Sequence, residues 1–231
     1  MVVSVTFCFL LSLNAGAIDW DLIDENFDDP DLDLMLIEHT AGDRTLEMEN
    51  GLAVLKRTGN PGDLGPTLRA YFDDPGTSQF ILYAKLDLKN IAEDGHFIIC
   101  ARINGFEYFP TIELDKIGDH ETPDQNGNGS RTMEVAVSPL GVHEYIIVGK
   151  SENAYDLYFD GKLIIENGVT RSLGGADWEV AQVMVHVRTG TDLEVHVDAI
   201  GLKEGNDGLM GVLAVSPKDK LPLTWGKVKE Q

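Results

Sequence analysis

The chain has 231 residues, of which 18 are Lys or Arg and 39 are Asp or Glu, so its formal net charge is −21 at pH 7. This charge excludes nucleic acid as a partner, because a polyanion would be repelled. To bind an anionic polysaccharide, the protein would need a local basic cleft or a bound cation that offsets the negative electrostatic field of its net charge. Hydrophobic residues make up 43% of the chain, enough for the core of one large all-β domain without disulfides or structural metals.

The N-terminal segment has the pattern of a secretion signal. Residues 2–13 are uncharged and mostly apolar, and Ala15-Gly16-Ala17 follows as a small-x-small pattern that signal peptidase cleaves. We therefore predict a signal peptide over residues 1–17 and a protein that is secreted, periplasmic or held at the cell surface. The alternatives are a buried first strand or a membrane anchor, although no later apolar segment is long enough to cross a membrane.

Strand patterns dominate from residue 45 onward. Asn50-Gly51 and Asn104-Gly105 are two-residue turn signals, each flanked by short runs of strand-forming residues. Counting back from the second turn places Arg102 opposite Glu107 as a cross-strand ion pair. Cys100 lies in the same apolar run and is expected to be a small buried residue without a catalytic role. Further strands are expected within 67–72, 79–88, 133–138 and 143–150, and no window has the 3.6-residue apolar period of a helix.

Residues 155–204 contain the clearest strand pattern of the chain. We predict two hairpins here, the first turning at Asp160-Gly161 and the second at Thr189-Gly190-Thr191. In the second hairpin Val183, Val185, Val187 and Leu193, Val195, Val197 would all face the core. A three-residue loop would then pair Arg188 with Asp192 and His186 with Glu194.

Two motifs in this region resemble known domains. YDLYFDGKLIIENG, residues 155–168, resembles the strand, Asp-Gly turn, strand signature of laminin-G-like domains. DLEVHVDAIGLKEG, residues 192–205, resembles the closing strand of the concanavalin A-like jelly roll. The resemblance implies an all-β, antiparallel β-sandwich over residues 18–205, followed by a C-terminal extension, 206–231, that packs on the sandwich or serves as a docking tail. The superfamily contains lectins, carbohydrate-binding modules, glycoside hydrolases and polysaccharide lyases, so enzyme and binder both stay open.

One acidic segment resembles part of a hydrolase motif. Within TIELDKIGD, residues 111–119, Glu113 and Asp115 would point to one face of a strand, as in the Glu-x-Asp-x-x-Glu strand of laminarinase-like glycoside hydrolases. The resemblance implies Glu113 as a catalytic candidate. Gly118 stands where the family has its acid/base Glu, and a retaining enzyme needs both carboxyl groups. The alternative is an exposed acidic strand end.

A calcium site is a further expectation. Asp124, Asn126 and Asn128, followed by Gly129, match the first half of the calcium-loop pattern, in which oxygens from alternate positions converge on one ion. The closing Glu would fall at Val135, one residue beyond Glu134. The alternative is a glycine-rich surface loop.

The polar side of the second predicted hairpin is a candidate for chemistry. Met184, His186, Arg188, Glu194, His196 and Asp198 would form one row opposite the core. On a concave face this row would bind sugar hydroxyls. Alternatively, it would supply the general base of a polysaccharide lyase and the group that neutralises the substrate's carboxylate, with His186, Arg188 and His196 as the catalytic candidates. On a convex face it would be solvated surface.

A binding module needs aromatic faces and planar hydrogen-bonding side chains. Tyr71, Phe106, Tyr108 and Trp178 are the aromatic candidates, with Arg102 and Asn104 as polar partners. Trp178 stands out because it follows a glycine-containing loop just before a strand, although it would serve equally well as a cap on the core. We therefore predict a secreted, non-catalytic glycan-binding or adhesion module with a structural calcium. The alternatives are a polysaccharide lyase or glycoside hydrolase, and a protein-interaction domain.

Overall fold

The computed structural model describes residues 20–28, 36–38, 44–59, 65–93, 95–119, 122–123, 129–130, 133–173, 181–189, 192–209 and 213. The predicted signal peptide, the calcium residues Asp124, Asn126 and Asn128, and Trp178 lie outside these residues. Within them, no helix is long and apolar enough to cross a membrane.

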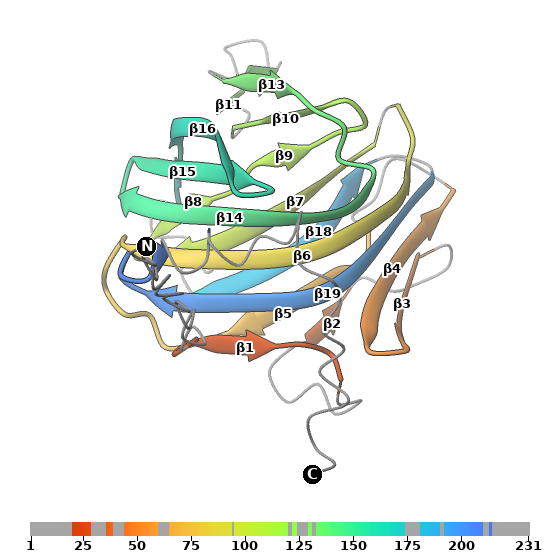
Figure 1. Ribbon diagram of the computed structural model, residues 1–231, viewed down its shortest axis with the longest axis horizontal. Coiled ribbons are helices and arrows are strands. Elements are labelled where there is room, and N and C mark those ends of the chain that lie inside the picture. The colour runs from red at the N-terminus through yellow and green to blue at the C-terminus, as the bar shows by residue number, and fades with distance from the viewer. Residues whose placement is uncertain are drawn as a thin grey trace, which may run out of the picture.

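The described strands form two large antiparallel sheets that face each other, as Figure 1 shows. Sheet A has the order β16-β15-β14-β6-β19-β4-β3, with β1 beside β19. Its strands are β1 (Ile23–Glu25), β3 (Arg44–Glu49), β4 (Leu52–Thr58), β6 (Phe80–Ile91), β14 (Gly141–Ser151), β15 (Ala154–Phe159), β16 (Lys162–Val169) and β19 (Asp192–Glu204).

Sheet B has the order β13-β10-β9-β7-β18-β5-β2, with β8 beside β7 and β17 beside β8. Its strands are β2 (Leu36–Glu38), β5 (Thr67–Tyr71), β7 (His96–Ile103), β8 (Phe106–Tyr108), β9 (Thr111–Ile112), β10 (Lys116–Gly118), β13 (Glu134–Ala136), β17 (Arg171–Ser172) and β18 (Gln182–Thr189). A separate ribbon joins β11 (Thr122–Pro123) to β12 (Gly129–Ser130). The predicted all-β antiparallel sandwich is confirmed.

The three predicted Asx-Gly turns are confirmed. The structure pairs Glu49 with Leu52, Ile103 with Phe106, and Phe159 with Lys162, so each turn has two residues. Both turn residues have positive φ in every case, for example 51° at Asn104 and 74° at Gly105. This conformation matches the right-handed twist of the flanking strands and favours Asn or Asp followed by Gly.

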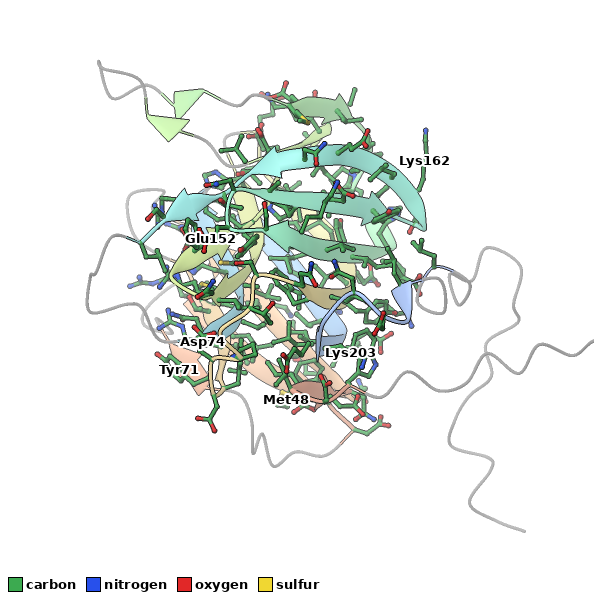
Figure 2. The ribbon with its side chains drawn as sticks, turned by 90° about the vertical axis from the view of Figure 1, so that its left-hand side faces the viewer. Met48, Tyr71, Asp74, Glu152, Lys162 and Lys203 are labelled. Atoms are coloured by element: carbon green, nitrogen blue, oxygen red, sulfur yellow. The ribbon has the colours of Figure 1, made fainter. Side chains whose placement is uncertain are left out.

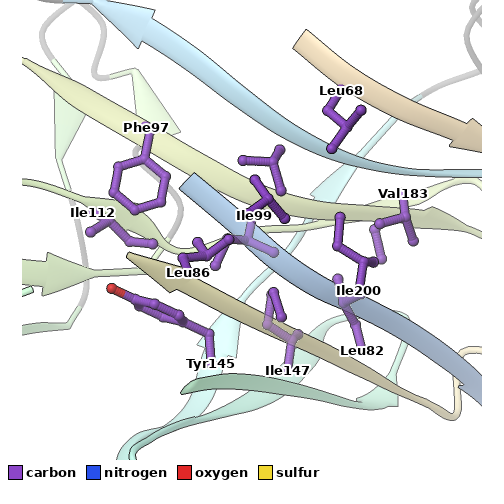
Figure 3. Close-up of a cluster of buried hydrophobic side chains, with 14 of the residues drawn as sticks. Leu68, Leu82, Leu86, Phe97, Ile99, Ile112, Tyr145, Ile147, Val183 and Ile200 are labelled. Atoms are coloured by element: carbon purple, nitrogen blue, oxygen red, sulfur yellow. The ribbon is translucent and has the colours of Figure 1, made fainter. Parts of the chain in front are cut away.

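The core lies between the sheets and is built by alternate residues of each strand (Figure 3). Sheet A contributes Leu82, Leu86, Tyr145, Ile147 and Ile200, and sheet B contributes Leu68, Phe97, Ile99, Ile112 and Val183. Each of these side chains has nearly no exposed surface. Non-directional burial of this apolar area is the main force that holds the two sheets together.

The second predicted hairpin is wrong. β18 pairs with β5 and β7 in sheet B, whereas β19 pairs with β4 and β6 in sheet A. The chain therefore crosses between the sheets after Thr189. The six predicted core residues from Val183 to Val197 are all buried, but they meet across the core instead of lying side by side in one sheet. His186 and His196 consequently belong to opposite outer faces.

The predicted acidic strand at residues 111–119 is also wrong in its local geometry. The segment is a hairpin between β9 and β10, in which the Glu113 N–H donates to Lys116 O at 3.0 Å. Glu113 and Asp115 therefore lie in the turn, and the alternation of a strand does not apply to them. Glu113 pairs with Lys116, whose Nζ lies 3.3 Å away.

The outer face of sheet A carries a second, smaller apolar cluster. Ile81, Ile146 and Val148 are covered by Trp20 and by Leu209 and Leu213, among other side chains. Trp20 stacks on Tyr83 with ring centroids 5.7 Å apart. Segments from both ends of the described chain thus pack on sheet A, and the beginning of the predicted C-terminal extension lies on the sandwich.

Candidate functional site

The outer face of sheet B combines polar and charged side chains from five strands. Because Leu68, Ala70, Ile99, Ala101, Val183 and Val185 point into the core, the residues between them point away from it. The strand register places Tyr71, Gln182, Arg102, Glu107 and Arg171 side by side in one row across β5, β18, β7, β8 and β17. We call this set the polar row.

Two further rows run parallel to the polar row. Arg69, Met184 and Cys100 occupy the next outward positions, and Phe109 packs with Met184, Cys100 and Ile98. Thr67, His186, Ile98 and Thr111 form the third row. The polar row therefore lies at one end of the strands, with an apolar cluster immediately behind it.

This face is largely buried although it lies outside the core. Glu107, Thr111 and Gln182 are each only 2% exposed. Tyr71 is the exception, with 43% of its surface exposed. Burying polar groups on a sheet face is unfavourable unless they are hydrogen-bonded, so this arrangement requires a dense polar network.

Glu107 is held between two arginines. Arg102 Nε and Nη2 each lie 2.8 Å from Glu107 Oε1, and Arg171 Nη2 lies 2.6 Å from Oε2. The predicted cross-strand pair of Arg102 and Glu107 is therefore confirmed. No sequence pattern indicates Arg171, because β17 pairs with β8 from a distant part of the chain. Charge-assisted contacts of this kind fix both guanidinium planes.

Arg69 supports Tyr71 at the edge of the face. Arg69 Nη1 donates to Tyr71 Oη at 3.0 Å, and its Cζ lies 5.8 Å from the ring centroid. The contact restrains the ring while leaving it accessible. Figure 2 shows Tyr71 near Asp74, at the end of the sandwich that faces the viewer.

Asn104 anchors a loop at the same end of the sandwich. Its N–H donates to Asp74 Oδ2 at 2.8 Å, and its Nδ2 donates to Ser78 Oγ at 3.2 Å. Asp74 also accepts the Gly76 N–H at 2.8 Å through Oδ1. Asn104 thus ties the β7–β8 turn to the loop that follows β5.

Tyr108 is a correction to the predicted ligand-binding set. Its ring is fully buried and packs edge-on against Phe80, with ring centroids 4.9 Å apart. Its hydroxyl donates to Ser151 O at 3.1 Å. A ring without an exposed face cannot stack on a sugar, so Tyr108 belongs to the core.

The predicted catalytic residues are not brought together. His186 lies in the third row of sheet B, is 8% exposed, and has Nδ1 2.5 Å from Thr67 Oγ1. His196 lies on the outer face of sheet A, with Nε2 2.5 Å from Glu194 Oε1. Glu113 lies in the β9–β10 turn, and the backbone of Arg188 belongs to β18, although its side chain is not described. The structure therefore does not form the predicted row in which one side chain acts as a general base and another neutralises the substrate's carboxylate.

The side chain of Cys100 is fully buried, as the sequence predicted. Burial raises the pKa of Cys100 well above its usual range, and the Glu107 carboxylate raises this pKa further. Among the described residues, no group of three or more His, Cys, Asp or Glu side chains could hold a metal ion. The calcium loop at residues 124–128 stays a prediction.

Comparison with known proteins identifies the fold. A scan against models of known families gives no match, and neither does a search among curated proteins. Among solved structures, the chain resembles an endo-acting O-glycanase of the human gut microbiota that initiates mucin breakdown, with TM-score 0.56, 16% identity, and 80% and 99% of the two chains covered.

Two other solved structures represent the enzymes and the binding modules. A family 16 glycoside hydrolase from the mixed-linkage glucan PUL of Bacteroides ovatus, in complex with a G4G4G3G product, has TM-score 0.52 and 10% identity over 78% of this chain and 99% of that one. The CBM2 module of the evolved Dit protein of Lactobacillus casei BL23 phage J-1 has TM-score 0.52 and 11% identity over 78% and 93%. The fold is therefore the concanavalin A-like jelly roll, which carbohydrate-cleaving enzymes and non-catalytic binding modules share.

Proposed function

We propose that the protein is a non-catalytic glycan-binding module whose ligand binds at the polar row of sheet B. The supporting observation is Tyr71, an exposed ring that Arg69 contacts at one end of the row, with Gln182 and Arg102 as the next side chains along it. An accessible aromatic face next to planar donors on rigid strands suits the apolar faces and hydroxyls of a sugar.

The alternative function is a carbohydrate-active enzyme on the same scaffold. A glycosidase needs two carboxyl groups across the scissile bond, about 5 Å apart in a retaining enzyme. In the described part of the polar row, Glu107 is the one carboxylate, and two arginines hold it. The predicted enzyme residues Glu113, His186 and His196 lie in three separate places. These observations favour a binder over an enzyme.

Secretion and calcium are part of the same proposal. A signal peptide at residues 1–17 would bring the module to extracellular or cell-surface glycans. A calcium ion would bind to Asp124, Asn126 and Asn128, since carboxylate and amide oxygens are the ligands that calcium prefers. N-terminal sequencing of exported protein and a thermal melt with and without chelator test these two parts.

The central test is a glycan-array screen of the protein with and without chelator, followed by a search for shortened or unsaturated products from each hit. We expect binding without turnover. Tyr71→Ala should weaken binding at least about tenfold, equal to about 1.4 kcal/mol. The matched control is Leu163→Ala, which removes a side chain that is 39% exposed on β16 of sheet A.

Each other outcome of this screen has a defined meaning. Turnover of a hit would replace the binder with an enzyme and direct mutagenesis to Glu113, His186 and His196. If Tyr71→Ala and Leu163→Ala weaken binding equally, the ligand does not bind at the polar row. Binding to none of the glycans would overturn the proposal in favour of a protein-interaction domain.

A further inference from the structure

A row of apolar and aromatic side chains crosses the outer face of sheet A. The strand register sets Tyr83, Ile146, Tyr158 and Leu163 side by side on β6, β14, β15 and β16. Tyr83, Ile146 and Tyr158 belong to the apolar cluster of that outer face. Directly opposed residues lie on the same face of a sheet, so Leu163 extends the cluster to the edge strand β16. We call these four residues the apolar strip.

The apolar strip is covered in one part and exposed in another. Trp20, Leu209 and Leu213 pack against the cluster to which most of the strip belongs, and Ile146 is fully buried there. Leu163 at the edge is 39% exposed. The cover that the described residues provide therefore does not extend over the whole strip.

The exposed leucine belongs to a larger apolar patch. Leu163, Val142 and Leu140 are three of the four large hydrophobic side chains that are exposed in the described part of the chain. His143 joins the start of β14 to the β15–β16 turn, since its Nδ1 lies 2.9 Å from Asp160 Oδ2 and its Nε2 lies 3.0 Å from Leu140 O. Contiguous apolar exposure of this kind marks an interaction surface.

The chain itself supplies an occupant for this surface. Residues 214–231 lie outside the described residues, and they directly follow Leu213, which packs on the same face. An extended backbone advances about 3.3 Å per residue, whereas neighbouring strands are only about 4.8 Å apart. Residues 214–221 alone are therefore long enough to cross the four strands of the apolar strip.

The sequence of this segment suits an apolar strip. Leu221, Leu223 and Trp225 alternate with other residues, so in an extended conformation they share one side. Pro222 stands between the two leucines, and a proline restricts the residue before it to extended backbone. The segment therefore presents two leucines and an aromatic ring together, the kinds of side chain that pack well against Tyr158 and Leu163.

The charge of the segment also suits its proposed position. In a chain of net charge −21, residues 214–231 contain two acidic residues and four lysines: Lys218, Lys220, Lys227 and Lys229. Burial raises the pKa of Tyr158, the Asp156 and Glu166 carboxylates raise it further, and Lys150 acts in the opposite direction. Two carboxylates thus lie near the strip, and lysines precede and follow the apolar alternation. Complementary charge of this kind favours the correct register of binding.

On these grounds we propose that residues 214–231 bind to the apolar strip of their own chain. The apolar side of the segment lies on Tyr158 and Leu163, and its lysines face the neighbouring carboxylates. The segment continues the cover that Leu209 and Leu213 begin, so the patch is closed to other proteins. The polar row lies on the opposite sheet, and this proposal stands apart from the glycan-binding function.

Photo-cross-linking of the full-length protein tests the contact directly. Benzoylphenylalanine is incorporated at position 225, the dilute protein is irradiated, and linked peptides are identified by mass spectrometry. We expect links within one chain to β14, β15 or β16. Leu163→Ser should lower their yield at least about threefold, because a leucine contributes through the apolar area that it buries. Tyr71→Ser, which replaces an exposed apolar side chain on sheet B, should leave the yield unchanged.

Limited trypsin digestion tests the same contact without an unnatural residue. Cleavage between Lys220 and Leu221 requires the segment to leave the sheet, so its rate reports the population of the undocked form. Leu163→Ser should accelerate this cleavage at least about threefold, for the same reason as above. Tyr71→Ser should not accelerate it. Leu163 is 39% exposed, so its replacement leaves the core intact.

The other outcomes contradict the proposal. Links between two chains would assign the apolar strip to a second copy of the protein. Links to sheet B, or no links at all, would show that the segment does not bind the strip. Equal cleavage rates in Leu163→Ser and Tyr71→Ser would overturn the proposal as well.

Discussion

Two ion pairs, one on the outer face of each sheet, differ in how deeply they are buried. On sheet A, Lys85 pairs with Asp198, and their side chains are 34% and 38% exposed. On sheet B, the Glu107 carboxylate that pairs with Arg102 is only 2% exposed. Exposed ion pairs add little to the free energy of unfolding. Removing one partner of a buried pair is strongly destabilising, because it leaves the other charge buried and unpaired. The fold should therefore depend more strongly on the pair of Arg102 and Glu107 than on the pair of Lys85 and Asp198.

The largest expected effect comes from breaking the buried pairs. Glu107→Ala leaves two guanidinium groups without their shared carboxylate and should lower the free energy of unfolding by about 3 kcal/mol or more. The matched variant Asp198→Ala on sheet A should lower it by less than about 1 kcal/mol. Urea denaturation measures both. Equal losses would show that the two faces do not differ in the way described.

The next effect tests how sheet A is covered. A Cβ added at Gly201 would lie 2.5 Å from the Trp20 ring, so Gly201→Ala must displace that ring. We expect a loss of about 1–3 kcal/mol from this overpacking. The same substitution in a Trp20→Ala background should cost clearly less. An unchanged cost in that background would mean that Trp20 does not pack on Gly201.

A smaller effect follows from two buried tyrosines that belong to sheet A. Burial raises the pKa of Tyr83 and of Tyr145 above the ordinary value of 10.0, and Glu144 adds to the increase at Tyr83. Above pH 10 the unfolded chain loses these phenol protons first, so the folded state binds more protons and its stability falls as pH rises. Urea denaturation from pH 9 to 11 should show this fall. Tyr83→Phe and Tyr145→Phe should each reduce its slope, and unchanged slopes would contradict the assignment.

The smallest expected effect is an absence of reaction. Because burial and Glu107 raise the pKa of Cys100, the native protein should not be alkylated at this residue by iodoacetamide at pH 8. The thiol should react fully once urea unfolds the chain. Mass spectrometry of the peptide containing Cys100 measures both. Rapid labelling of the native protein would mean that the outer face of sheet B is open.

The sequence predicted what depends on local geometry. The Asx-Gly turns follow from the backbone preferences of two residues, and the pair of Arg102 and Glu107 follows from counting back from one turn. Tyr71 and Arg69 were also accessible to sequence analysis, because they alternate with Leu68 and Ala70. Tyr71 is among the predicted aromatic candidates, whereas Arg69 is not among the predicted polar partners.

Non-local relations were beyond the reach of the pattern. The strands β18 and β19 show the same period-2 alternation whether they pair in one sheet or face each other across the core. The sequence therefore placed His186 and His196 in one row, although they lie on opposite faces. The contact of Arg171 with Glu107 likewise depends on the tertiary fold, since nothing near either residue predicts it.

The most direct test of the central claim, that the polar row of sheet B binds the glycan, is NMR mapping of backbone amides. The isotopically labelled protein is titrated with the oligosaccharide that binds best in the glycan-array screen. We expect shifts at Tyr71, Arg102 and Arg171, with little change at Lys85 and Asp198. Shifts concentrated on sheet A, with the polar row unchanged, would contradict the account.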